Sequence, residues 1–131
     1  VPHTLVFTGQ RWHARAWCEK NQGYRDFVLS RFRGTPEILE ESPHSGGDDS
    51  AWNTRVTIRI IADPRLRPEQ QEVVRRDYGM CDGALLITIR CTLVSYALKL
   101  LGIDAGAPVA EPEARQIMVA NLDELRPWLF D

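Results

Sequence analysis

The first forty residues show the two-residue alternation that is typical of β-strands. From Gln10 to Cys18 apolar or small residues alternate with mostly basic ones. One side carries Trp12, Ala14, Ala16 and Cys18, and the other carries Arg11, His13, Arg15 and Trp17. A turn-prone stretch at 20–23 precedes a second alternating run, Tyr24–Phe32, and a short β-prone run, Thr4–Phe7, comes before both. The pattern predicts a β-hairpin, which two or three strands do not stabilise alone.

The residues after position 52 alternate between strand and helix patterns. Strands are expected around 55–60, 84–91 and 115–120, and helices over 69–78, 92–101 and from 121 onward. The residues that mark the helix ends are Pro68 at the start of the first, Gly79 and Gly102 after the first two, and Asn121 as the N-cap of the third. A repeated strand–helix order predicts a small α+β domain, ferredoxin-like in arrangement.

A stretch rich in Gly, Ser, Pro and Asp separates the two parts. Residues 41–50 read ESPHSGGDDS and lack apolar periodicity, which is typical of a flexible acidic linker. We therefore expect a hairpin region over 1–40, a linker over 41–51 and an α+β domain over 52–131. The hairpin must either pair with the second part or have its remaining strands upstream.

The net charge of −2 on 131 residues conceals an uneven distribution. Residues 1–35 carry +4, residues 36–50 carry −5, residues 51–100 carry +3 and residues 101–131 carry −4. Only two of the sixteen basic residues are lysine. This dominance of arginine favours bidentate contacts to phosphate or carboxylate, with a GC-rich genome as the alternative explanation.

The composition disfavours several classes of site. A chain with 44% hydrophobic and 26% charged residues is typical of a globular protein. No apolar run reaches the roughly 18 residues of a membrane span. The three cysteines lack C-x-x-C spacing and the three histidines are scattered, so we expect buried free thiols in a reducing cytoplasm, no metal and no cofactor. Phosphate-binding, dinucleotide-binding and hydrolase motifs do not occur.

The basic residues of the hairpin are its strongest functional feature. They are Arg11, His13, Arg15, Arg25 and Arg31. Like charges that face each other across strands destabilise a sheet unless an anion lies among them. The aromatic residues interleaved with them are Trp17, Tyr24 and Phe27, a combination typical of a site for a nucleotide or single-stranded nucleic acid. The alternative is a solvated basic surface that Glu19 and Asp26 partly neutralise.

Both parts of the chain resemble one family. Residues 11–17 (RWHARAW) and 24–31 (YRDFVLSR) resemble the end of a WYL domain, a small Sm-like β-barrel of bacterial transcription regulators, although only Trp12 of the name-giving triplet is kept. Residues 59–71 (RIIADPRLRPEQQ), 75–80 (RRDYGM) and 96–103 (YALKLLGI) are similar to the WCX extension of WYL regulators attached to phage-defence systems. The resemblance implies an α+β protein with a partial Sm-like β-barrel followed by a small ferredoxin-like domain.

The resemblance also implies partners and site residues. Family members place a winged helix-turn-helix upstream, so we expect the C-terminal part of a cytoplasmic regulator that binds DNA through a winged helix not present here, without a membrane partner. It implies a homodimer in which each extension reaches its partner, and a pocket for a nucleotide or oligonucleotide effector. By motif position the ligand-binding residues are His13, Arg15, Arg25, Ser30 and above all Arg31, with Arg11 as a further candidate and Trp12 in the barrel core.

Three functions follow from these features. The first is an effector-sensing and dimerisation module without catalytic residues. The second is a small phosphoesterase or nuclease with His13 as acid or base, for which no nucleophile or orienting carboxylate is evident. The third is a dimerisation domain without a ligand. On the strands of the second part, Arg55, Arg59 and Arg90 are expected to form a second anion-binding face.

Overall fold

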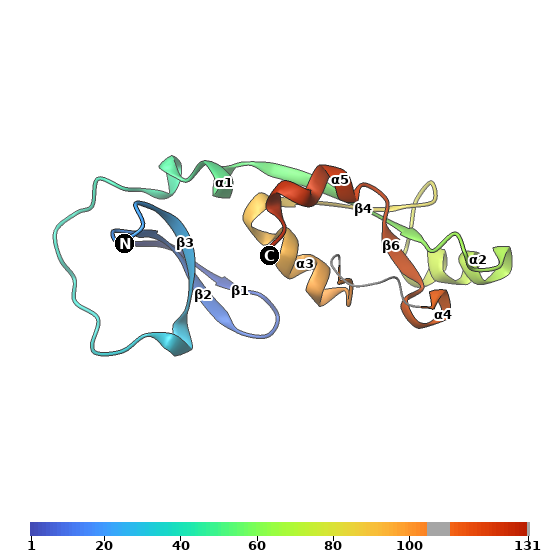
Figure 1. Cartoon of the computed structure of the whole chain (residues 1–131), viewed down its shortest axis with the longest axis horizontal. Coiled ribbons are helices and arrows are strands. Elements are labelled where there is room, and N and C mark those ends of the chain that lie inside the picture. The colour runs from blue at the N-terminus through green and yellow to red at the C-terminus, as the bar shows by residue number, and fades with distance from the viewer. Residues whose placement is uncertain (105–110, 131) are drawn as a thin grey trace. The chain divides into compact units, whose positions relative to one another are not determined.

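The computed structural model describes residues 1–104 and 111–130 and divides the chain into two compact units, Val1–Asn53 and Thr54–Asp131. Each unit contains one three-stranded antiparallel sheet, and most of the helices belong to the second (Figure 1). The predicted α+β class is confirmed. The first sheet is open and does not close into a barrel.

The first unit is a meander of three strands with β2 in the centre. The strands are β1 (Pro2–Phe7), β2 (Trp12–Cys18) and β3 (Gly23–Val28), in the order β1-β2-β3. The predicted hairpin is therefore present, but its second strand ends at Val28 rather than Phe32. Val28 pairs with His13, and β2 begins only one residue earlier, so the chain beyond Val28 has almost no strand left to pair with. It turns instead into a 3-10 helix, η1 (Leu29–Arg31).

The segment predicted to be a linker is partly folded. A 3-10 turn, η2 (Gly46–Asp48), and a single helical turn, α1 (Ser50–Asn53), precede the second unit, with the buried Asp49 between them. Thr54 alone separates α1 from the next strand.

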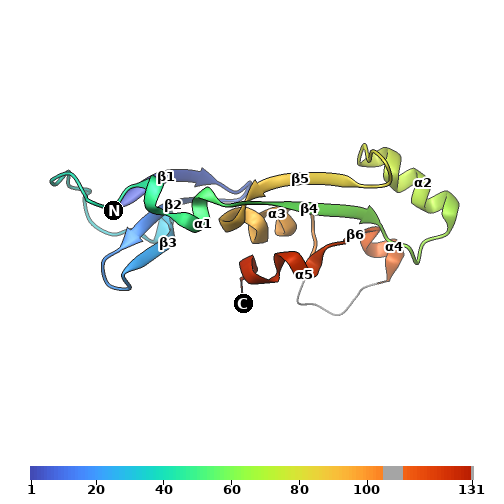
Figure 2. The ribbon, with the colours of Figure 1, turned by 90° about the horizontal axis from the view of Figure 1, so that it is seen from above.

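The second unit follows the strand–helix order that the sequence predicts. Its strands are β4 (Arg55–Ala62), β5 (Leu85–Arg90) and β6 (Ile117–Val119), arranged β5-β4-β6 with β4 in the centre. Its helical segments are α2 (Pro68–Asp77), η3 (Cys91–Leu93), α3 (Val94–Leu100), α4 (Pro112–Arg115), α5 (Leu122–Leu125) and η4 (Arg126–Trp128). Figure 2 shows α3 and α5 on the same side of the β4–β5 ribbon.

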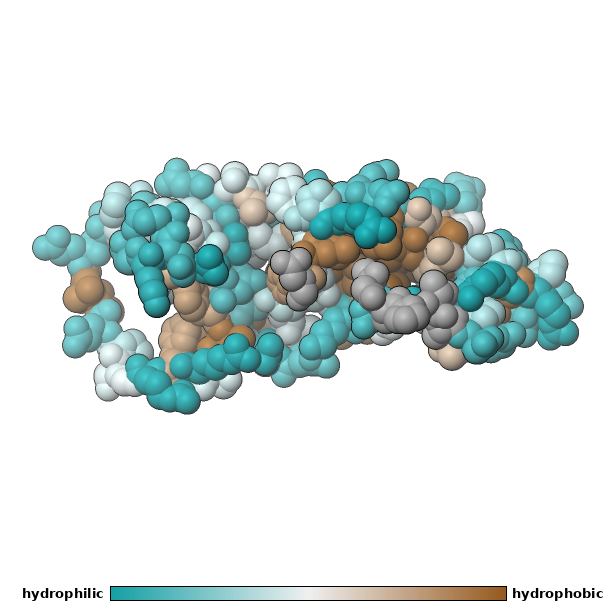
Figure 3. All heavy atoms as spheres, in the orientation of Figure 1, coloured by the Kyte–Doolittle hydropathy of each residue, from teal (hydrophilic) through white to brown (hydrophobic). Residues whose placement is uncertain are grey.

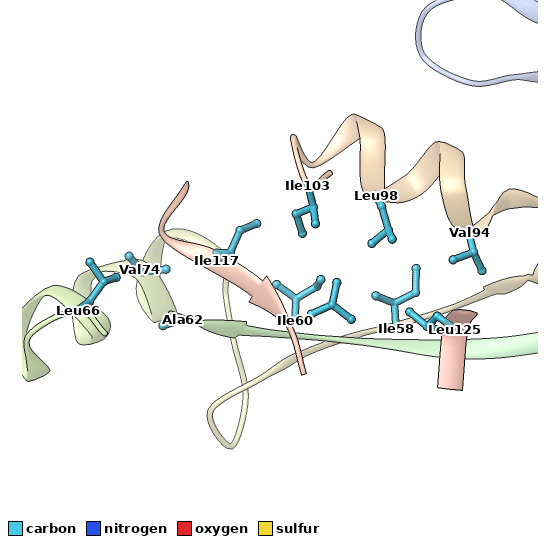
Figure 4. Close-up of a cluster of buried hydrophobic side chains, with 11 residues drawn as sticks. Ile58, Ile60, Ala62, Leu66, Val74, Val94, Leu98, Ile103, Ile117 and Leu125 are labelled. Carbon is cyan, nitrogen blue, oxygen red and sulfur yellow. The ribbon is translucent and has the colours of Figure 1, made fainter. Parts of the chain in front are cut away.

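The core of the second unit lies between this sheet and α3. Ile58 and Ile60 are fully buried and point from β4 toward Val94 and Leu98 (Figure 4). Leu125 of α5 belongs to the same cluster. The alternation of β4 thus buries one face of the sheet and leaves the other, with Arg55 and its neighbours, accessible to solvent.

Two helices end in the same glycine-dependent motif. Gly79 and Gly102 have φ of 61° and 74°, in the left-handed region that only glycine adopts readily. The amide after each glycine donates a hydrogen bond back to a carbonyl of the last helical turn. Met80 N donates to Arg75 O at 2.9 Å, and Ile103 N donates to Leu98 O at 2.9 Å. The predicted helix ends are confirmed, and the second return brings Ile103 into the core.

Asn121 does not cap α5 with its side chain, contrary to the prediction. It occupies the N-cap position, but its Oδ1 accepts a hydrogen bond from Arg59 N at 2.9 Å and its Nδ2 donates to Thr57 O at 2.7 Å. The amide side chain therefore pairs with the edge of β4 just beyond β6, where backbone groups would otherwise lack a strand partner.

The three cysteines are free. Only Cys91 is buried, whereas Cys18 is half-buried and Cys81 is exposed, so the expectation of buried thiols holds for Cys91 alone. In the described ranges, no helix is both long and apolar enough to cross a membrane.

Leu98→Ala is expected to lower the free energy of unfolding of the second unit by about 2–5 kcal/mol, because Leu98 is only 2% exposed and its loss opens a cavity. Leu100→Ala on the same helix is the matched control, since that side chain is 67% exposed. Urea denaturation followed by circular dichroism measures both. Equal losses in the two variants would contradict this description of the core.

Candidate functional site

The centre of the first unit is a buried ion pair between Arg15 of β2 and Asp49. Arg15 Nε lies 2.7 Å from Asp49 Oδ2, and Arg15 Nη2 lies 3.0 Å from Asp49 Oδ1, so the contact is bidentate. The third nitrogen, Nη1, donates to Asp26 Oδ1 at 3.2 Å. Arg15 and Asp49 are 8% and 1% exposed. Arg15, expected to hold an anionic ligand, is thus already neutralised by two carboxylates of its own chain.

The register of β2 and β3 decides which residues lie beside Arg15. Arg15 pairs with Asp26, and Ala16 pairs with Arg25. Because directly paired residues share a face, Arg25 lies on the opposite face of the sheet from Arg15 and His13. The expectation that Arg25 faces Arg15 is therefore wrong, since the sequence alternation leaves the register open.

His13 is buried on the same face as Arg15. Its Nε2 lies 3.6 Å from Asp26 Oδ1. Burial lowers the pKa of the His13 imidazole; Asp26 opposes this shift, whereas Arg15 and Arg11 add to it. The buried imidazole is consequently favoured in its neutral form.

His3 reaches Asp49 through an irregularity in β1. The register of β1 shifts between Pro2 and Thr4, which leaves His3 as the extra residue. A bulge of this kind turns a side chain away from its regular direction. His3 Nε2 lies 3.0 Å from Asp49 Oδ2, while His3 Nδ1 contacts Thr4 Oγ1 at 2.7 Å.

Residues 44–52 cover this polar face with further contacts. The ring of His44 stacks on Trp17 with centroids 3.8 Å apart and an interplanar angle of 10°. Tyr24 Oη donates to Ser45 O at 2.7 Å, and Trp52 lies edge-on to His3 at 5.5 Å. Trp17 and Tyr24, expected to stack on a ligand, instead hold the chain that leads to the second unit.

The electrostatics of Asp49 follow from these partners. Burial alone would raise the pKa of its carboxyl, but the hydrogen bonds from Arg15, His3 and the backbone of Trp52 outweigh burial and lower that pKa. The same contacts raise the pKa of Arg15 despite its burial. The pair is therefore ionised in the folded chain.

One end of this face remains accessible. Arg11 lies two residues before His13 on the same side of β2, and η1 follows Val28, the strand partner of His13. Ser30 and Arg31 of η1 are exposed, as is Arg11. Within the described ranges, neither Arg11 nor Arg31 takes part in an ion pair. Arg11 and Arg31 are therefore both accessible to an anion in solution.

The opposite face of the first sheet carries exposed large apolar side chains, together with exposed Arg25 and the small, buried Ala14 and Ala16. Leu5, Phe7 and Trp12 share it and are 60%, 53% and 49% exposed, with the rings of Phe7 and Trp12 5.2 Å apart. Trp12, expected in the core of a barrel, is half uncovered in this chain.

Two observations on the described residues bear on the alternative of a phosphoesterase or nuclease. His13 is nearly inaccessible, and no group of three or more His, Cys, Asp or Glu side chains there has the arrangement of a metal site. Of the residues predicted to bind a ligand, the structure brings His13 and Arg15 together on one face beside Asp26 and places Arg25 on the other face. Ser30 and Arg31 lie exposed in η1.

Sequence reasoning missed Asp49 because it lies in a stretch of loop composition. A local signal was available: Asp49 accepts a hydrogen bond from Trp52 N at 3.2 Å, the N-cap contact of α1. Its pairing with Arg15, 34 residues away, has no local signal.

Asp49→Asn is expected to lower the free energy of unfolding of the first unit by about 3–5 kcal/mol, because it leaves a buried guanidinium without its main carboxylate. In a Trp128→Phe background the remaining tryptophans, at 12, 17 and 52, all report on the first unit, so urea denaturation followed by fluorescence measures the effect. Asp48→Asn, an exposed neighbour, should cost about 1 kcal/mol or less. If both variants matched the parent, the ion pair would not stabilise the unit.

The first unit is expected to lose stability as the pH falls from 7 toward 5. The pKa of His13 is lowered in the folded chain, so the unfolded chain takes up a proton first and is favoured as the pH decreases. His13→Gln should flatten this dependence in the same fluorescence assay. Identical slopes for parent and variant would exclude His13 as the cause.

Comparison with known proteins gives two family matches. Residues 1–35 match the WYL domain, and residues 55–125 match the family described as BrxR transcriptional regulator, C-terminal dimerization domain. The DNA-binding transcriptional repressor CapW of Stenotrophomonas maltophilia is 37% identical over 128 residues, covering 98% of this chain and 43% of that protein. The CapW repressors of Escherichia coli (strain KTE188) and Pseudomonas aeruginosa are 40% and 33% identical over 125 residues, covering 95% of this chain and 42% of each relative.

These relatives are named as repressors, not as enzymes, and the chain spans about 43% of the length of the first. The second family match covers more than half of the chain and all three strands of the second unit. The first match covers the sheet that carries Arg15, whereas Asp49 lies beyond the matched residues. The chain thus belongs to the BrxR family of transcriptional regulators through its C-terminal dimerization domain, which here follows WYL-domain sequence.

Proposed function

We propose that this chain is the effector-sensing and dimerisation part of a cytoplasmic, phage-defence-associated WYL transcription regulator. The relatives named CapW support the class, because they are described as DNA-binding repressors and are similar over almost the whole of this chain. In this proposal the regulator is a homodimer and binds DNA through an upstream winged helix.

The remaining strands of the WYL barrel, in this proposal, lie against the apolar face of the first sheet. Leu5, Phe7 and Trp12 form a contiguous exposed apolar surface, which a protein in water covers with other apolar groups. Covering this face leaves the polar face, with its ligand candidates, on the other side of the sheet.

The effector is an anionic nucleotide or single-stranded oligonucleotide that binds at the accessible end of the polar face. The observation that carries this proposal is that Arg11 and Arg31 are exposed and form no ion pair with a described residue, and that exposed Ser30, directly before Arg31, has a hydroxyl group that can donate a hydrogen bond. Arginine binds phosphate oxygens in a bidentate manner, which suits this ligand class.

Asp49 offers a route from ligand to dimer in this proposal. An anion that extends from Arg31 past His13 to Arg15 competes with the Asp49 carboxylate for the same guanidinium nitrogens. Losing that contact loosens residues 44–53, which lead into β4 of the dimerisation domain with Thr54 alone between. A ligand shifts DNA affinity only if it contacts two arrangements of the dimer differently, and competition with Asp49 provides that difference.

Arg31→Ala is expected to weaken binding of a 5′-phosphorylated, fluorescently labelled oligonucleotide about tenfold or more, because one charge-assisted contact is lost. Fluorescence anisotropy measures binding, and size-exclusion chromatography should show an unchanged dimer. Arg76→Ala, an exposed arginine on α2, is the matched control and should bind like the parent. Parent-like affinity of Arg31→Ala would reject the site, and cleavage of the oligonucleotide at excess protein would favour the phosphoesterase alternative.

A further inference from the structure

One face of the second sheet is not covered by any described helix. The side chains of β4, β5 and β6 that point away from the core form it, and we call it the arginine face: Arg55, Thr57, Arg59, Ile61, Leu86, Thr88, Arg90 and Met118. The described helices α3 and α5 contribute to the core on the opposite side (Figures 2 and 4). Leu86 is 59% exposed, so the arginine face is open to solvent in the single chain.

The charges on the arginine face call for an anionic partner. Arg55 and Arg59 are both exposed on β4, and Arg55 lies directly opposite Arg90 in the pairing of β4 with β5. No described carboxylate forms an ion pair with Arg55 or Arg59, in contrast to the paired arginines of α2. Thr57 and Thr88 are a directly paired couple on the same face, and their hydroxyl oxygens lie 3.0 Å apart in a hydrogen bond. Arg55 and Arg59 are four residues apart on one strand, which separates their Cα atoms by about 13 Å.

A segment of the first unit has the complementary composition. The loop between η1 and η2 bows away from the first sheet (Figure 1), and its residues Glu37–Glu41, which we call the acidic arm, carry three carboxylates. Ile38 is 103% and Leu39 is 79% exposed. Figure 3 shows apolar atoms set among hydrophilic ones on this loop. None of the arm's carboxylates has an ion pair with a described residue.

The spacing of the two elements matches once the arm is extended, which requires the bend at Glu40 of the single chain to straighten. In an extended segment, residues two apart share a side, so Glu37, Leu39 and Glu41 point the same way. Glu37 and Glu41 are then about 13 Å apart, the same distance as Arg55 and Arg59. Leu39 lies between them and provides an apolar contact for the exposed side chain of Leu86.

We propose that the acidic arm of one copy of this chain binds the arginine face of a second copy. Two equivalent contacts of this kind arise in a symmetric dimer, since each copy carries both elements. The inference rests on the proposed dimer and names a surface for it. It places the three carboxylates of the acidic arm against a basic surface of the partner.

The composition of the arginine face favours a peptide over nucleic acid as its occupant. Proteins that bind single strands combine cations with aromatic side chains on which bases stack, and the arginine face has no aromatic residue. It has Leu86, with Ile61 and Met118 half-buried beside it, which a phosphate backbone would leave exposed. An arm that alternates carboxylates with Ile and Leu covers both kinds of group.

A charge-exchange experiment on the 131-residue chain tests the proposal. One variant carries Glu37→Arg, Glu40→Arg and Glu41→Arg, and the other carries Arg55→Glu and Arg59→Glu. Each alone is expected to dimerise about tenfold or more weakly than the parent, because like charges now meet at both contacts. A mixture should form heterodimers with parent-like affinity, because each arm then meets a face of opposite charge on the other copy. Sedimentation of differently tagged chains measures both.

The outcomes separate this inference from the proposed function. If the parent dimerises and each variant does so equally well, the inference is overturned and the dimeric regulator stands. If the parent does not dimerise, both fail. If the arm binds the arginine face of its own chain, mixing the two variants does not restore dimerisation. That result also overturns the contact between copies.

A disulfide experiment locates the contact directly. In a Cys18→Ser, Cys81→Ser background, Leu39→Cys in one tagged chain is expected to form a disulfide with Leu86→Cys in another under mild oxidation. Val73→Cys, 58% exposed on α2, is the matched control and should not be linked. Linkage no stronger than the control overturns the proposal. The proposal is also overturned if the double variant Arg55→Glu, Arg59→Glu dimerises like the parent but no longer binds the oligonucleotide. That result would assign the arginine face to nucleic acid.

Discussion

The first unit depends on the burial of one arginine. A guanidinium taken out of water is strongly destabilising unless its charge and its donors are matched, and Arg15 is matched on all three nitrogens by Asp49 and Asp26. The same contact holds residues 44–53 onto a sheet that has only three strands and little apolar core of its own. Asp49 therefore has two effects at once: its carboxylate neutralises Arg15, and it attaches residues 44–53, which lead to the dimerisation domain, to the sheet.

This pairing sorts the basic residues by role. Arg15 stabilises the fold, whereas Arg11 and Arg31 are exposed and form no ion pair with a described residue. Burial favours the neutral form of His13, so this residue adds no further charge beside Arg11 and Arg15. A basic cluster that looks uniform in the sequence thus consists of a structural part and an accessible part.

The elements were predictable, and the contacts between them were not. Periodicity located β2, β4, α2 and α3 because burial of one face imposes it directly on the sequence. Register is a different matter, because alternation in each strand does not decide which face of β3 lies on the same side as Arg15, and a slip by one residue exchanges the two faces. The observed pairing places Asp26 rather than Arg25 beside Arg15. Asp49 and Asn121 share a second obstacle, because each satisfies backbone or charge more than thirty residues away. From the local sequence alone, Asp49 is interpreted as a loop residue and Asn121 as a helix cap.

The Arg15–Asp49 contact also sets the length of the connection between the two folded parts of the chain. While Asp49 stays paired with Arg15, residues up to Asn53 belong to the first unit, and the carbonyl of Thr54 already accepts a hydrogen bond from Cys91 N of the second unit at 2.8 Å. In the proposed mechanism, loss of the ion pair turns residues 44–53 into a flexible chain, and the root-mean-square span of such a chain grows with the square root of its length. The length of the connection is then a property of one ion pair rather than of the number of residues alone.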